Sequence, residues 1–295
     1  KLAAILIDTA RELVDRKILV VFFGIVTLTL LLFALALQTD VAGGAITSLK
    51  VFGMGGRSSP EGFRFGTEEP GTVGGLQAET MVRGVQLVVA FVLYPLGILL
   101  SLFATAGLVP RLLERGTIDL LLSKPMSRPA LFVARYLGGL LVAALNLVYL
   151  VVGLGAILAL KTGVWNGGFV LSALLMTLYF GCLLGFLVLV GVLSRSTTVS
   201  IMVVALVYVA SVAVRPMHEN RDWPLLITGH ASRFVTQALV ETTYHLLPRT
   251  YDFGRMLTVL ILRDGDFTWG PILWSAVSGA GALALATAWF SRRDF

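Results

Sequence analysis

Residues 110–135 read PRLLERGTIDLLLSKPMSRPALFVAR and separate two long apolar runs. The charged side chains of this stretch cannot lie in hydrocarbon, whereas its leucines and its isoleucine recur at helical spacing. We therefore expect a water-side helix over residues 110–128, held at both ends by membrane spans and suited to receive force from a soluble partner. We call residues 110–128 the lever segment. Its charged members are Arg111, Glu114, Arg115, Asp119, Lys124 and Arg128.

The overall composition indicates a membrane protein. Hydrophobic residues make up 57% of the chain and charged residues only 14%, whereas about a quarter of the residues are charged in typical soluble domains. We predict an all-α integral membrane protein with a single transmembrane domain over residues 1–295, because a backbone exposed to lipid must satisfy its own hydrogen bonds. Six apolar runs are long enough to cross roughly 30 Å of hydrocarbon. They are Ile18–Leu37, Val82–Val109, Leu131–Leu160, Gly168–Leu193, Val199–Val214 and Trp269–Phe290.

The positions of the basic residues predict the orientation. An N-terminus in the cytoplasm places the lever segment, Arg195, Arg292 and Arg293 on the same side, as the positive-inside rule requires. We expect a multi-pass protein of the plasma (inner) membrane with both termini cytoplasmic and with residues 38–80 and 215–268 outside. The net charge of +6 is explained by this topology and by attraction to anionic lipid, and no basic and aromatic surface for nucleic acid is evident.

The first 17 residues have the pattern of an amphipathic helix lying along the membrane interface. Leucine and isoleucine alternate there with acidic and basic residues at helical spacing. A cleaved signal peptide ending at the small residues Ala34–Ala36 is the alternative interpretation, although acidic residues in the leading segment and a long apolar run argue against it.

The two outer segments differ in character. Residues 38–80 are rich in glycine, so we expect mostly loop with a short paired element around Thr47–Phe52. In residues 215–268, the stretch Ser232–Leu247 has an apolar face that includes Phe234 and Leu239, and a second short helix follows the break at Pro248. We expect this pair to form an outer cap over the mouth of the bundle. A helix that merely rests on lipid is the alternative.

The predicted spans contain few polar residues. No Asp or Glu lies in the middle of a span, which argues against a proton- or sodium-coupled carrier. The single cysteine, Cys182, excludes an intrachain disulfide, and the three histidines match no metal-ligand spacing, so we predict no metal site. The main buried polar residues are candidates for pathway or helix contacts. They are Asn146, Tyr149, Tyr179 and Tyr208.

Glycines at two places in the spans predict close helix packing. Gly181 and Gly185 are four residues apart, and Gly279 and Gly281 lie in an alanine-rich run of the last span. Such spacings let two backbones approach closely without identifying which helices meet.

One motif carries a resemblance to a known family. Glu114-Arg115-Gly116-Thr117, followed by Leu120-Leu121-Leu122-Ser123, Pro125 and Ser127-Arg128, is similar to the signature of the ABC type-2 permeases, the membrane subunits of ATP-binding-cassette transporters. The terminal Arg293-Asp294-Phe295 resembles the ending of that family. The resemblance implies that the lever segment is a coupling helix that binds a separate nucleotide-binding ATPase subunit, and that two permease copies assemble with two ATPase chains. The implied ATPase-binding residues are Arg111, Glu114, Arg115, Gly116, Thr117, Asp119, Lys124 and Arg128.

The function implied by this resemblance is that of a permease driving export or extracytoplasmic delivery. The chain contains no phosphate-binding P-loop and no nucleophilic triad, so we expect no enzyme activity and no directly bound cofactor, with ATP and magnesium held by the partner subunit. An alternative is an ATP-driven mechanotransmitter or scaffold that docks an extracytoplasmic protein. A secondary carrier is the third interpretation.

Overall fold

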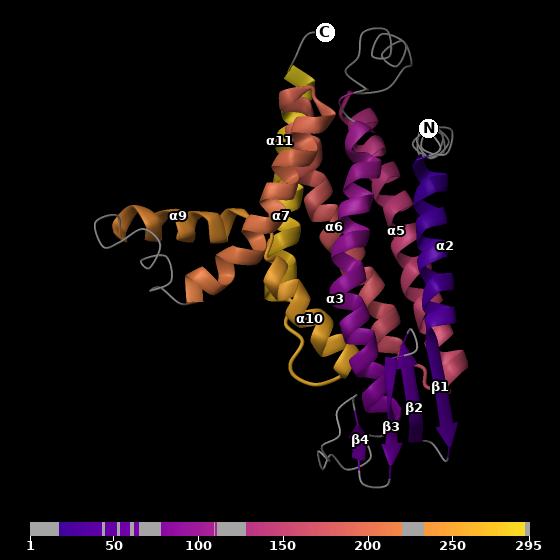
Figure 1. Ribbon diagram of the computed structural model, residues 1–295. Helices are drawn as coiled ribbons and strands as arrows, with labels where there is room; N and C mark the ends of the chain where they lie inside the picture. The colour runs from indigo at the N-terminus through magenta and orange to yellow at the C-terminus, as the bar shows by residue number, and fades with distance from the viewer. Residues whose placement is uncertain are drawn as a thin grey trace.

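The apolar runs of the sequence form long helices that lie side by side, with a small β-sheet at one end, in this computed structural model (Figure 1). Among the described residues, five helices are long and apolar enough to cross a membrane, and a shorter apolar helix, α2 (Ile18–Ala36), lies beside α5. The five are α3 (Ala78–Thr105, continued by the 3-10 turn η1, Ala106–Leu108), α5 (Arg128–Thr162), α6 (Gly167–Ser194), α7 (Thr197–Glu219) and α11 (Gly270–Arg292). The structure describes residues 18–42, 45–51, 54–59, 62–64, 78–108, 110, 128–219 and 233–292.

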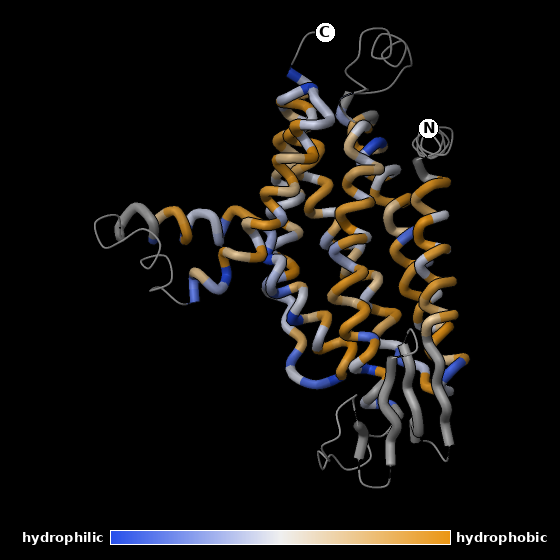
Figure 2. The backbone as a smooth tube through the Cα atoms, viewed as in Figure 1, coloured by the Kyte–Doolittle hydropathy of each residue, from blue (hydrophilic) through white to orange (hydrophobic). Residues whose placement is uncertain are grey.

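The prediction of an all-α membrane protein is confirmed for the helical bundle. Hydrophobic residues run along the whole length of its helices and hydrophilic ones gather at their ends (Figure 2). Many large apolar side chains point outward, such as Leu206 and Val277, which are 68% and 66% exposed. A contiguous apolar exterior of this kind is expected where the surrounding solvent is lipid.

Helix α6 is the centre of the bundle. It packs against α5, α7 and α11, and it is the most buried of the five long helices. Its aromatic residues Phe169, Tyr179 and Phe180 are fully buried among apolar side chains of the neighbouring helices. At its crossing with α11, Gly185 lies so close to Gly279 that a methyl group on either residue would overlap the other helix.

The sheet follows α2 directly. Strands β1 (Leu37–Ala42), β2 (Ala45–Val51), β3 (Met54–Ser59) and β4 (Gly62–Arg64) pair antiparallel in the order of the sequence. The paired element expected around Thr47–Phe52 corresponds to β2, but the sheet is larger than predicted because the neighbouring glycine-containing stretches also pair. We call this end of the bundle the sheet end, and the end near Pro110 and Arg128 the lever end.

The second predicted outer segment contains two helices, as expected. These are α9 (Arg233–Leu246) and α10 (Thr250–Leu262), with Pro248 between them. Helix α9 extends sideways from the bundle, whereas α10 returns to pack against α3, α6 and α7 (Figure 1). Helix α7 also continues past the predicted limit Val214 to Glu219, so that Arg215 belongs to its last turns.

Candidate functional site

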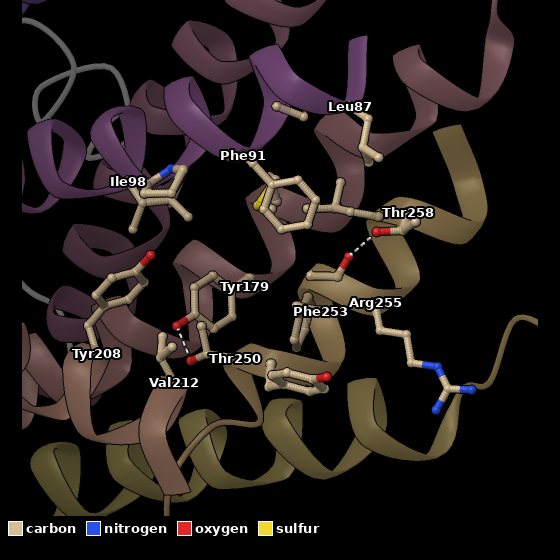
Figure 3. A pocket seen from close by; sticks show the side chains of 16 residues that line it. Leu87, Phe91, Ile98, Tyr179, Tyr208, Val212, Thr250, Phe253, Arg255 and Thr258 are labelled. Carbon is tan, nitrogen blue, oxygen red and sulfur yellow. Dashed lines mark hydrogen bonds between the residues drawn. The ribbon is translucent and has the colours of Figure 1, made fainter. Parts of the chain in front are cut away.

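A cavity of about 490 Å³ lies between α3, α6, α7 and α10 (Figure 3). Its size is that of a site for a small organic molecule. Most of its lining is aliphatic or aromatic, and hydroxyl groups come from both tyrosines and threonines. The lining residues are Leu87, Ala90, Phe91, Pro95 and Ile98 of α3; Met176 and Tyr179 of α6; Tyr208 and Val212 of α7; and Thr250, Tyr251, Phe253, Gly254, Arg255, Leu257 and Thr258 of α10.

Helix α10 forms one wall of this cavity because one of its faces is apolar. Phe253, Met256, Leu257 and Ile261 recur at helical spacing and are all buried against the bundle. The opposite face carries Tyr251 and Arg255, which are exposed. The sequence therefore favours a helix that buries one side in the bundle. The cavity is lined by Phe253 and Leu257 of that side and by the exposed Tyr251 and Arg255.

Hydrogen bonds hold the first turn of α10 against α6, α7 and α11. The hydroxyls of Tyr179 and Thr250 lie 2.5 Å apart, and Ser211 of α7 also hydrogen-bonds to Thr250. The backbone N–H of Arg249 donates to Ser275 Oγ of α11 at 2.9 Å. This hydroxyl cluster satisfies polar groups that would otherwise be costly to bury.

The last turn of α10 is held at the sheet end by a second polar group. Asn166 Nδ2 donates to the carbonyl of Ile261 at 2.9 Å and to Gln86 Oε1 at 2.7 Å. Arg83 Nη1 donates to the carbonyl of Leu262 at 2.8 Å. Because the last carbonyls of a helix have no partner within the helix, these bonds from α3 and α6 fix the end of α10 in place.

A buried ion pair connects α10 to α7. The carboxylate of Asp252 is 1% exposed and pairs with the guanidinium of Arg215, which also donates to Glu219 Oε1 at 2.9 Å. Among the described residues, Asp252 Oδ2 has no further hydrogen-bond partner. Within the part of the chain that the structure describes, Arg215 is therefore the group that compensates this carboxylate, since burial of an unpaired charge is strongly unfavourable.

Two of the four predicted pathway residues meet at the cavity. Tyr179 and Tyr208 both line it, with ring centroids 6.4 Å apart. Asn146 and Tyr149 lie elsewhere on α5: Asn146 is buried, and the hydroxyl of Tyr149 lies 3.2 Å from Thr27 Oγ1 of α2. The roles of all four as pathway or helix contacts remain predictions.

The predicted ATPase-binding residues and part of the predicted cap cannot be placed. Residues 111–127, the N-terminal segment 1–17 and the side chains of Arg128 and Phe234 lie outside the described residues. The other predicted cap residue, Leu239, is 62% exposed on α9.

The base of α9 is attached to α7 by an aromatic and ionic cluster. His218 of α7 stacks on Tyr244 at 4.1 Å between ring centroids, and its Nε2 lies 3.1 Å from Glu241 Oε2. Glu241 also lies near His245, whose carbonyl accepts a hydrogen bond from Trp274 of α11. Within the described part of the chain, no group of three or more histidine, cysteine or acidic residues is placed to hold a metal ion.

Sequence reasoning missed the contribution of α10 to the site. Asp252, Thr250 and Arg255 were assigned to an outer segment, because a helix of 13 residues is too short to read as a span. The helical spacing of Phe253, Met256 and Ile261 was the available signal for a face that packs into the bundle. The absence of carboxylates from the spans holds for the spans themselves, but α10 brings Asp252 into the protein interior.

Comparison with known proteins decides the family. Residues 4–295 match the family model described as ABC-2 family transporter protein. The chain belongs to the ABC-2 transporter family. No curated protein matches it. Membership over almost the whole chain makes this ABC-2 protein the membrane component of an ATP-binding-cassette transporter, and it confirms the resemblance carried by the lever segment.

The family and the structure agree on a multi-pass ABC-2 membrane protein. The predicted apolar runs correspond to α2, α3, α5, α6, α7 and α11, and the helices differ from the predicted bounds by a few residues at most ends. In this ABC-2 protein, α3 both lines the cavity and runs on to the lever end.

Proposed function

We propose that this ABC-2 protein is the permease through which a separate ATPase subunit drives export across the plasma membrane. The observation that supports the proposal most directly is the path of α3. Its residues Leu87–Ile98 line the cavity, and the helix then continues to Leu108, next to the lever segment. The ten residues between Ile98 and Leu108 span about 15 Å at 1.5 Å per residue.

In this mechanism the lever segment receives the push of the ATPase and α3 transmits it to the cavity. A rigid helix that tilts at one end moves the side chains at its other end, so Phe91 and Pro95 would shift against α10. Helix α10 is held at both of its ends by hydrogen bonds, and its first turn is also held by the Arg215–Asp252 pair. Tilting of α3 against this fixed wall would widen or narrow the cavity.

The proposed orientation places the lever end in the cytoplasm and the sheet end outside. Helix α6 ends next to Arg195 and α11 ends at Arg292, both at the lever end of the bundle (Figure 1), and short basic connections are typical of the cytoplasmic side. A second permease copy completes the transporter, with ATP and magnesium bound by the partner ATPase.

The test is docking of the ATPase to full-length permease variants. Reversal of charge at Glu114 and Arg115 should reduce co-purification of the ATPase at least about tenfold, since interfacial charge pairs contribute strongly when one partner is removed. The matched control is charge reversal at Asp264, which is exposed at the sheet end. Unchanged capture of the ATPase by the double reversal would remove the lever segment from the interface.

A second function is favoured by the position of α9. This helix extends from the bundle with Leu239 and Leu246 more than 60% exposed, as an arm for an extracytoplasmic protein would. In that case motion driven by ATP would be passed to a docked protein instead of moving a substrate. Replacement of Leu239 by Ala would then abolish capture of that protein and leave ATPase activity in detergent intact. If α9 instead caps the transport route, the same replacement should alter the stimulation of ATPase activity by substrate.

A further inference from the structure

The cavity has the length of one leaflet of a membrane. Along α3 its lining runs from Leu87 to Ile98, which is 11 residues or about 16 Å at 1.5 Å per residue. The hydrocarbon core of a bilayer is roughly 30 Å thick, so one leaflet is roughly 15 Å. The lining begins only five residues, or about 8 Å, after Val82, where the membrane-spanning part of α3 starts. Along α3 the cavity therefore extends from about 8 Å to about 24 Å beyond Val82, across the middle of the membrane-spanning part of this helix.

The cavity is also open toward the surrounding lipid. Phe91 of α3 and Tyr251 of α10 belong to its lining, yet they are 54% and 45% exposed. Gly254 of α10 also lines the cavity, and a Cβ atom there would be 3.8 Å from the ring of Phe91. A side chain larger than a methyl group at Gly254 would therefore press on Phe91 and narrow the gap between α3 and α10.

A positive charge stands at this opening. Arg255 belongs to the lining, is exposed, and in Figure 3 its guanidinium extends away from the aromatic residues of the cavity. Seven residues, about 10 Å of helix, separate it from Leu262 at the sheet end of α10. Arg255 therefore lies about 10 Å inward from the sheet end, and its long exposed side chain can extend from there toward the headgroups.

With respect to the described residues, Arg255 differs from its neighbours in having no ionic partner. Arg215 pairs with Asp252 and Arg83 with Glu79, whereas none of the described residues pairs with Arg255. An arginine guanidinium is always charged and binds carboxylate or phosphate groups through two parallel hydrogen bonds. An apolar cavity of one leaflet's length with an unpaired guanidinium at its opening matches a molecule with an anionic head and an apolar chain.

We propose that this cavity binds an anionic amphiphile, with its chain between α3 and α10 and its carboxylate or phosphate head on Arg255. The inference rests on the proposed function, because it treats the cavity as part of the substrate route. It names the substrate class of that route: a lipid-like anion taken from, or delivered to, the surrounding bilayer. A neutral amphiphile of the same length lacks the partner that Arg255 needs.

The test is equilibrium binding of two radiolabelled probes, laurate and dodecanol, to the full-length permease in a neutral detergent at pH 8. They carry the same chain and differ in the charge of the head. Laurate should bind about tenfold more tightly, as expected for a charge-assisted hydrogen bond. Arg255→Gln should remove that difference by weakening laurate alone. Arg263→Gln, which changes an exposed arginine at the end of α10 outside the cavity, is the matched control and should leave both affinities unchanged.

Two further measurements separate a cavity site from other modes of binding. Gly254→Leu should abolish binding of both probes by filling the cavity between α3 and α10. Thr258→Phe, which fills the cavity from the next turn of α10, replaces it in the assay if Gly254→Leu does not fold. Dodecyl phosphate should compete with laurate, and millimolar inorganic phosphate should not. Competition by inorganic phosphate that survives Gly254→Leu would reveal a surface anion site and overturn the proposal.

Other outcomes would also overturn it. Equal affinities for laurate and dodecanol would mean that the cavity holds lipid chains without selecting the head. Failure of both probes, combined with a disulfide between two copies of a Gly254→Cys variant, would assign the cavity to a second permease copy. Because the assay contains no ATPase, its result is independent of whether the lever segment docks one. A permease that captures its ATPase but fails to select laurate would refute the substrate class alone.

Discussion

Replacement of Gly185 by alanine should force α6 and α11 apart. An added Cβ on Gly185 would lie 2.5 Å from the carbonyl oxygen of Gly279, whereas ordinary contacts begin at 3.4 Å. The helices must therefore separate locally by the difference, 0.9 Å. Both sides of this contact are backbone, so no side-chain rotation can relieve it. The reverse change, Gly279→Ala, meets the same obstacle, since its Cβ would lie 2.6 Å from Cys182 Cα.

The expected loss of stability follows from this separation. Overpacking of a close contact costs roughly 1–3 kcal/mol, and a gap of 0.5–1 Å forfeits about a quarter to a half of the dispersion energy of the atoms that line it. The α6–α11 interface is the most extensive helix contact in the described structure. We therefore expect Gly185→Ala to cost about 2–3 kcal/mol, at the upper end of that range.

The assay is thermal unfolding of the purified protein in detergent, with Gly281→Ala as the matched control. Gly281 also lies on α11, but nothing stands within 4 Å of an added Cβ. Alanine is favoured over glycine in a helix by up to about 1 kcal/mol, so the control should unfold at the same or a higher temperature than the natural protein. A Gly185→Ala variant as stable as Gly281→Ala would refute the backbone contact between α6 and α11.

Three further predictions concern stability and topology. Arg215→Met should destabilise the protein by about 3–5 kcal/mol, because it leaves the buried Asp252 charged and unpaired. Asp252→Asn should cost less in the same unfolding assay, since the guanidinium of Arg215 keeps Glu219 as a carboxylate partner. Asn166→Ala should speed hydrogen exchange in the last turn of α10, because it removes the hydrogen bond from Asn166 to the carbonyl of Ile261. Asn146→Leu is the control and should leave this exchange unchanged, because Asn146 Nδ2 makes no hydrogen bond within the described residues. A cysteine in place of Arg292 should resist a membrane-impermeant thiol reagent until the cells are permeabilised, and labelling from outside intact cells would reverse the proposed orientation.

The spans and their order were determined by the sequence itself. Hydrocarbon thickness sets a minimum length for an apolar helix, so runs such as Gly168–Leu193 already mark α6 to within a residue. The second outer segment was predictable for the same kind of local reason. Pro248 has no backbone N–H and separates two amphipathic patterns, which are α9 and α10. The lever motif, finally, sufficed to indicate the family.

The tertiary structure alone decided which faces meet. The sequence offered Gly279 and Gly281 equally, and only packing selects Gly279 for the contact with Gly185. Four polar residues of the spans were equivalent candidates, yet only Tyr179 and Tyr208 share the cavity. The physical reason is that lipid and protein interior are almost equally apolar, so a hydrophobic pattern does not tell a face that contacts lipid from one that contacts another helix. The choice between them depends on close packing and on hydrogen bonds such as that of Asn166 to α10, which involve residues far apart in the chain.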